Sequence, residues 1–233
     1  AHWMSYSPVL VASNQPVISS GTGYVRDLFM SGSTLNITSR DFNVYGDAVF
    51  NTISGSGRVY LRKSGGTIRG CGVQANIETV EDITLAGRTQ FSGSFKINPG
   101  DRVYLGPNTL EADGTFTSNC SNTANDGLHM THAAGELIGD AGALYFINRA
   151  DSGSCNTEGQ LTAGTIRVRK SFNVTHESGS RSQKAFVSTG TKVVFDGGTP
   201  TFSMTSGEGR TLSRFHDVEF LVSTNTSGSW AST

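Results

Sequence analysis

The sequence has little charge, little proline and no long apolar run, and each shortage excludes a class of protein. Only 16% of its 233 residues are charged, and the formal net charge is −1. This balance argues against a protein that binds nucleic acid or a membrane surface electrostatically. No stretch reaches the roughly 18 apolar residues that a membrane-spanning helix needs. The sequence has only five prolines, and short apolar segments recur regularly between its frequent glycines. This regular pattern also excludes a disordered chain.

Motifs of common enzyme classes are missing as well. The sequence has no GxSxG or Walker motif, and no GxGxxG in a strand–helix context. Acidic residues occur at Glu81, Asp82, Asp140, Asp151 and Asp196, but they do not recur at the interval that a carboxylate-lined face would require. Asp196 precedes a glycine and is interpreted as a turn residue. We therefore expect no enzyme activity.

Two histidines are candidate metal ligands. His129 and His132 are close in sequence, but no cysteine or carboxylate stands at a matching spacing. Two ligands are fewer than a usual zinc site has. We interpret both as solvated loop residues and expect neither a metal nor any other cofactor.

One tetrapeptide occurs twice and suggests the architecture. The residues RVYL occupy 58–61 and return at 102–105, with Ile-Thr-Leu at 83–85 between them and Leu-Asn-Ile at 35–37 before them. These apolar–polar–apolar cores follow one another at steps of 24, 24 and 20 residues. Self-similarity at such an interval indicates a stacked repeat architecture. The sequence therefore predicts an all-β, single-stranded β-solenoid, similar to a parallel β-helix, with coils of about 22 residues.

The strand cores divide the chain into four segments. Paired apolar residues separated by one polar residue recur over 31–116 and again after residue 160, with Gly-rich turns between them. Each pair faces one side of a strand, because strand side chains alternate. Residues 117–160 are polar and turn-rich, with one strong strand at 144–147. We predict an N-terminal cap or edge strand at 1–30, coils at 31–116, an inserted loop at 117–160, and coils with a C-terminal cap at 161–233.

The three cysteines have different surroundings. Cys120 and Cys155 lie in polar, turn-rich sequence, whereas Cys71 directly follows a strand pattern. A Cys120–Cys155 disulfide would hold the insertion in place. In the chain-entropy model this bond would stabilise the fold by roughly 3–4 kcal/mol. Cys71 would then be a buried free thiol. Three reduced cysteines are the alternative.

The second half of the chain resembles a known family. The matching segments are GTIRV (164–168), SFNV (171–174), FVSTGTKVVFDG (186–197) and RFHDVEF (214–220). They are similar to the repeat unit of the bacterial β-strand-repeat family of large secreted and surface proteins. The first half looks like the same kind of solenoid with weaker detail, and together the resemblance covers about two thirds of the chain. It implies a solenoid in a stalk, adhesin or other exported protein. It also implies that His216 packs at the edge of a coil.

Two tyrosines are candidates for surface contacts. Tyr60 and Tyr104 stand between the apolar residues of the repeated tetrapeptide, so we expect them at the same outward position of two coils. They could stabilise adjacent coils as a surface ladder, worth roughly 0.2–1 kcal/mol per pair. They could instead form a platform for sugar rings. We prefer the ladder.

The chain ends favour self-association. A solenoid terminates in strand edges that invite pairing with another chain, and head-to-tail contacts that do not close produce fibres. We expect the segment Val9, Leu10 and Val11, or the region near Trp230, to be held by a neighbouring copy. The chain opens AHWM, without the basic-then-apolar pattern of a leader, as a mature secreted chain or a chain with remnants of a tag would.

These observations together predict an extracellular or cell-surface protein with a non-catalytic structural or adhesive role. Self-association through the solenoid ends makes it a candidate subunit of a surface filament. The main alternative is a polysaccharide-binding or polysaccharide-cleaving β-helix, similar to a phage tailspike, with a surface polysaccharide as its partner. A segment of a much larger surface or phage tail protein is a third possibility.

Overall fold

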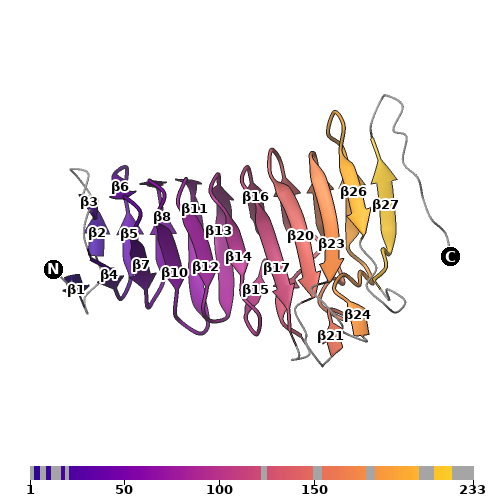
Figure 1. Cartoon of the computed structure of the whole chain (residues 1–233), viewed down its shortest axis with the longest axis horizontal. Coiled ribbons are helices and arrows are strands. Elements are labelled where there is room, and N and C mark those ends of the chain that lie inside the picture. The colour runs from indigo at the N-terminus through magenta and orange to yellow at the C-terminus, as the bar shows by residue number, and fades with distance from the viewer. Residues whose placement is uncertain are drawn as a thin grey trace.

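The computed structural model is all-β over the residues it describes, and its strands lie side by side along one axis (Figure 1). These residues are 3–5, 9–11, 17–18, 21–121, 125–148, 154–176, 182–204 and 213–221, with only the backbone described below 21 and at 154, 176, 182 and 183. Every strand pair among them is parallel. Long parallel sheets of this kind are those of a solenoid-like fold, as the sequence predicts.

The strands form three columns, which we call faces A, B and C. Face A is the ten-stranded sheet: β1 (Trp3–Ser5), β4 (Gly23–Val25), β7 (Asp41–Val44), β10 (Arg58–Leu61), β12 (Asn76–Thr79), β14 (Phe95–Ile97), β17 (Phe116–Cys120), β20 (Ala143–Asn148), β23 (Ser171–His176) and β26 (Thr201–Met204). Faces B and C together make up the 15-stranded sheet.

Two long strands, β11 (Gly66–Val73) and β13 (Ile83–Phe91), run through both of these faces. The remainder of face B is β2 (Val9–Val11), β5 (Leu28–Met30), β8 (Ala48–Phe50), β15 (Arg102–Tyr104) and β18 (Gly127–His129). The remainder of face C is β3 (Val17–Ile18), β6 (Thr34–Ile37), β9 (Thr52–Ser54), β16 (Thr109–Ala112), β19 (Glu136–Gly139), β22 (Thr165–Val168), β25 (Lys192–Phe195) and β27 (Asp217–Phe220).

A narrow core runs the length of the stack. In β10, Val59 and Leu61 are buried while Tyr60 between them is partly exposed, which is the alternation expected of a strand with one buried face. The same pattern in successive coils joins the buried apolar side chains, from Val25 to Phe195, into one cluster. Paired apolar residues are enough to build this fold because only a few side chains of each coil reach the core.

The coils differ in length. Register partners on face A are 17 to 21 residues apart between Trp3 and Phe116, and 28 to 30 apart between Phe116 and Phe202. The coils therefore do not repeat at one fixed interval, although the nine steps from Trp3 to Phe202 average about 22 residues, as predicted. Each coil carries up to three short strands with the same alternation, so similar sequences do not stack: RVYL at 58–61 forms β10 on face A, whereas its repeat contributes β15 on face B.

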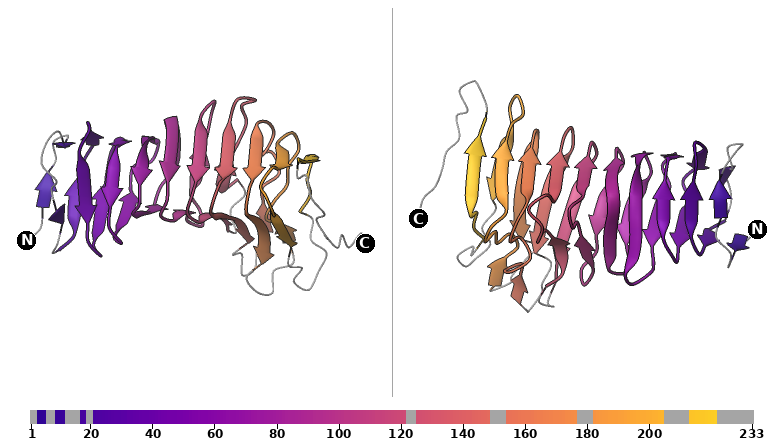
Figure 2. Two further views of the ribbon diagram at one scale, coloured as in Figure 1. Left: turned by 90° about the horizontal axis from the view of Figure 1, so that it is seen from above. Right: turned by 180° about the vertical axis from the view of Figure 1, so that it is seen from behind.

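Residues 117–160 do not form an inserted loop. Strands β17, β19 and β20 pair in register with the coils before and after them. The additional residues of the longer coils lie after the face-A strands, where β21 (Ser154–Asn156) pairs with β24 (Ser182–Lys184). We call this pair the arm. It projects from the body near the C-terminal end, as both views in Figure 2 show.

A sharp corner in β11 places Cys71 on the surface, so the prediction of a buried thiol is wrong. Cys71 is a free, exposed cysteine, and the register of β11 against β13 shifts on both sides of the preceding residue, Gly70. Gly70 has a φ of 130°, and a Cβ there would lie 2.0 Å from the carbonyl oxygen of Phe50. Glycine is therefore required for the chain to turn here, and the turn directs Cys71 outward.

Candidate functional site

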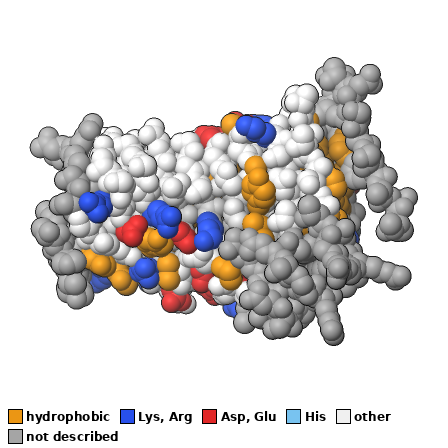
Figure 3. Space-filling view, viewed as in Figure 1, with side chains coloured by type: hydrophobic (Ala, Val, Ile, Leu, Met, Phe, Trp, Pro, Cys, Tyr) orange, Lys and Arg blue, Asp and Glu red, His pale blue; other side chains and the backbone are white. Residues whose placement is uncertain are grey.

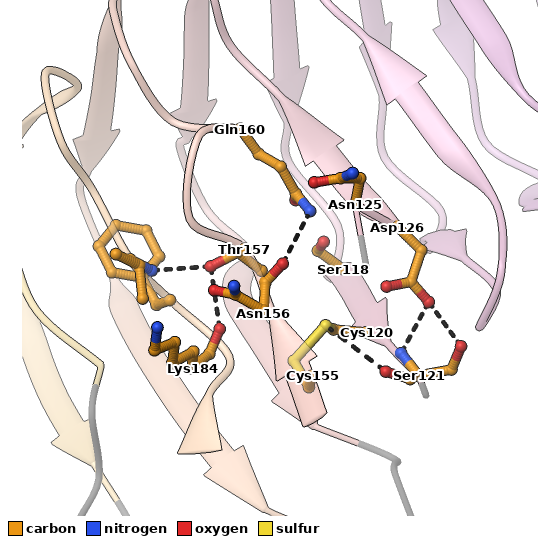
Figure 4. Close-up of a disulfide and its surroundings, with 12 residues drawn as sticks. Ser118, Cys120, Ser121, Asn125, Asp126, Cys155, Asn156, Thr157, Gln160 and Lys184 are labelled. Atoms are coloured by element: carbon orange, nitrogen blue, oxygen red, sulfur yellow. Dashed lines mark hydrogen bonds between the residues drawn. A yellow bond between two sulfur atoms is a disulfide. The ribbon is translucent and has the colours of Figure 1, made fainter. Parts of the chain in front are cut away.

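The predicted disulfide joins Cys120 at the end of β17 to Cys155 in the arm (Figure 4). Their Cα atoms are 5.4 Å apart, and both side chains are buried. The bond links one coil to the arm strand of the next. It confirms the pairing predicted from the sequence and stabilises the base of the arm.

Buried polar groups around the disulfide are held by hydrogen bonds. The carboxylate of Asp126 accepts from the backbone N–H and the hydroxyl of Ser121, both at 2.7 Å. The hydroxyl of Thr157 donates to the carbonyl of Lys184 at 3.0 Å and accepts the N–H of Val187 at 2.8 Å (Figure 4). Such contacts offset the cost of burying polar groups.

The two tyrosines of the repeated tetrapeptide lie on different faces. Tyr60 accepts a hydrogen bond from Arg58 at 3.3 Å, and the guanidinium of Arg62 lies 5.2 Å from its ring centroid. The ring of Tyr104 lies 4.7 Å from that of His129 on face B. Tyr60 and Tyr104 therefore form neither a common ladder nor a common platform, because the repeat that relates them in sequence does not stack in space.

The two candidate histidines have different environments. His129 lies in β18, and its Nε2 is 2.8 Å from the carbonyl oxygen of Asn125. His129 is half-buried and lies in a strand, so the prediction of a solvated loop residue is wrong for it, and burial lowers its pKa. His132 is exposed, and its Nδ1 accepts from the N–H of Ala134. Among the residues with described placement, no three His, Cys, Asp or Glu side chains are grouped to hold a metal ion.

Acidic side chains of face C are paired with arginines. Asp196 lies 2.9 Å from Arg167 and 3.5 Å from Arg169, and Arg169 also contacts Asp140. Asp151 lies outside the described residues. On the surface shown in Figure 3, acidic and basic side chains are interspersed. This is the arrangement of structural ion pairs that link coils, each worth little on an exposed surface.

The surroundings of Asp101 disfavour the charged form of its carboxyl group. Asp101 accepts a hydrogen bond from the hydroxyl of Thr79 at 2.7 Å. Burial raises the pKa of Asp101, and the charges of Asp82 and Glu81 act in the same direction. Asp82 itself accepts the backbone N–H of Arg102 at 2.9 Å. These contacts are local to the connections between faces A and B.

The last coil among the described residues is less buried than the coils before it. Phe172, Phe186 and Phe195 are at most 2% exposed, whereas Phe220 and Leu221 are 48% and 56% exposed. Phe195 and Phe220 stack with ring centroids 5.0 Å apart. The other inward-directed residues of this coil are only partly buried, namely Phe202, Met204, Phe215 and Val218. We call the six residues Phe202, Met204, Phe215, Val218, Phe220 and Leu221 the terminal layer. His216 beside them is exposed, so it does not pack as the resemblance implies.

The residues that the sequence predicts for assembly are not those of the terminal layer. Val9, Leu10 and Val11 form β2, which pairs with β5 of the same chain. Their side chains and Trp230 lie outside what the structure describes. The terminal layer was missed because its members follow the ordinary pattern of a buried strand. Only their position in the last coil exposes them.

Comparison of the chain with protein-family models, with curated proteins and with solved structures finds no match. No helix in the described ranges is long and apolar enough to cross a membrane.

Proposed function

We propose that this chain is a non-catalytic structural or adhesive protein of the cell surface that self-associates end to end as the subunit of an extracellular filament. The observation that carries the proposal is the terminal layer, with two large apolar side chains about half exposed at one end of the stack. Exposed apolar surface of this kind is typical of interaction sites. A second copy stacked on this end would bury it as each internal coil buries its neighbour.

Three further features support this proposal. A buried intramolecular disulfide is compatible with an oxidising, extracellular compartment. The resemblance of residues 164–220 to the bacterial β-strand-repeat family favours an exported protein. We also propose that the fold is a single-stranded solenoid, in which one chain winds through faces A, B and C in turn. Such a solenoid has two unlike ends and so extends by head-to-tail contact.

A polysaccharide-binding or polysaccharide-cleaving function remains the alternative prediction. Aromatic and acidic residues repeated on one face would support it, and Tyr60 and Tyr104 lie on different faces. Each ring also has one side next to another residue of the chain, Arg62 and His129 respectively. These observations favour the structural role.

Light scattering and negative-stain imaging over a range of concentrations test the proposed function. We expect masses that grow with concentration and particles elongated along one axis. A particle that keeps the monomer mass of 24.7 kDa at every concentration would refute self-association.

Two substitutions of equally exposed aromatics sharpen the test. Phe220→Ser changes the terminal layer, and Tyr45→Ser changes a residue of similar exposure, 47%, that follows β7 in the body of the stack. We expect Phe220→Ser to raise the concentration for half-assembly by about tenfold or more, as the loss of a buried phenylalanine contact predicts. Tyr45→Ser should leave it unchanged. Equal effects of the two substitutions would assign assembly to a surface other than the terminal layer.

A further inference from the structure

The two ends of face A have matching strand directions. Its order begins at β1 and finishes at β26, and all of its pairs are parallel. A copy translated along the axis therefore presents β1 to β26 with both strands running the same way. A two-fold contact between two C-terminal ends would instead require antiparallel pairing, which occurs nowhere among the described strands.

The hydrogen-bonding direction of β26 is fixed by its neighbours. Thr201 donates its N–H backward to the carbonyl of Lys170. Alternate residues of a parallel strand direct their N–H groups to opposite sides, so Met204 directs its N–H forward, away from β23. The same direction is seen at Phe95, whose N–H donates forward to Thr115 of the next coil. The outer side of β26 thus presents a backbone donor where a further strand would accept it.

Neither terminal strand of face A carries the features that protect sheet edges. Natural edge strands are commonly blocked by charges or proline. The sequences of β1 (WMS) and β26 (TFSM) contain neither. A junction between the two strands would therefore bury no charged side chain of either.

We propose that β1 of a second copy pairs in parallel with β26, so that face A runs unbroken from one subunit into the next. This inference rests on the proposed function and specifies its junction. The register of face A aligns Trp3, through the intervening coils, with Phe202. Continuing that register places Trp3, Met4 and Ser5 of the second copy beside Phe202, Ser203 and Met204.

Thiol cross-linking tests this register. In a Cys71→Ser background, Met4→Cys combined with Ser203→Cys should give a ladder of covalent oligomers with a short bis-thiol reagent. Thr117→Cys in place of Ser203→Cys is the matched control, because residue 117 occupies the same position of face A in an internal coil. It should give no ladder. Dimers formed by Ser203→Cys alone would indicate a two-fold contact and overturn the proposal.

A second pair of variants tests the backbone of β26. Met204→Pro removes the forward N–H, whereas Met204→Ala keeps it and also shortens the side chain. We expect Met204→Pro to raise the concentration for half-assembly at least tenfold above that of Met204→Ala, with the far-ultraviolet circular dichroism of the two unchanged. Assembly of the parent chain with no ladder, or with equal behaviour of the two variants, would refute this junction while leaving self-association intact. A parent chain that stays monomeric would refute both.

Discussion

Removing the Cys120–Cys155 bond is expected to destabilise the chain by about 3–4 kcal/mol. The cysteines are 35 residues apart, and the chain-entropy model gives about that value for a loop of this size. Both side chains are buried, so Cys120→Ala with Cys155→Ala removes the bond without burying a new hydroxyl. At a urea m-value of about 2–3 kcal/mol/M, the midpoint of unfolding should fall by about 1–2 M.

The assay is urea unfolding followed by far-ultraviolet circular dichroism, with hydrogen exchange of β21 and β24 as a local measure. Exchange in the arm should accelerate more than exchange in β10, because repeat proteins transmit stability mainly between neighbouring units. Cys71→Ser is the control, since Cys71 is exposed and unbonded. It should shift the free energy of unfolding by no more than about 0.5 kcal/mol. A double variant that unfolds with the parent at the same urea concentration, and exchanges no faster in the arm, would refute the reasoning.

Three other predictions concern the core, the turns and pH. Phe146→Ala should cost about 3–5 kcal/mol in urea unfolding, because its ring is 1% exposed, while Phe220→Ala, at 48% exposed, should cost less than half as much. Gly142→Ala should cost at least about 2 kcal/mol, since a Cβ there would lie 1.6 Å from a carbonyl oxygen, whereas Gly198→Ala, with nothing within 4 Å of its Cβ, should be nearly neutral. Burial raises the pKa of Asp101, so its ionisation opposes folding once the pH exceeds the ordinary aspartate value. Asp101→Asn should therefore stabilise at pH 7, and this gain should shrink as the pH falls to that value in a urea-midpoint titration. An equal effect at all pH values would contradict this interpretation.

The strands of the first half could be predicted from the sequence, but their stacking could not. Apolar pairs such as Val59 and Leu61 are enough to indicate a strand with one buried face. They do not indicate which face of the coil the strand belongs to. A coil with up to three such strands produces similar sequences at intervals unrelated to its length, and RVYL is the clearest case.

The strand β17 was missed for a different reason. Its sequence FTSNC is polar, and yet Ser118 and Asn119 are buried. The hydroxyl of Ser118 accepts the N–H of Leu128 at 3.0 Å, and the amide of Asn119 donates to the carbonyl of Ile97. Polar side chains that hydrogen-bond within their own coil or to the preceding coil can replace apolar ones inside a solenoid. Apolar alternation alone does not reveal them.

The cysteine pair was predictable and the terminal layer was not. Two cysteines in turn-rich sequence suggested the bond, while the exposure of Cys71 depends on a corner that only the backbone geometry defines. The exposure of Phe220 depends on the number of coils and their register. Neither quantity can be obtained from strand patterns when coil length varies along the chain.

The connection between faces A and B varies in length, so coils of different length can pack in the same way. Three residues connect β12 to β13, whereas twelve separate β20 from Leu161, the residue that resumes face B. The strands of face A nevertheless stay in register across this change. The corner can therefore accept additional sequence without disturbing the core. A peptide epitope grafted between Thr79 and Ile83 would be displayed once per molecule, and in a filament it would repeat at the spacing of the subunits.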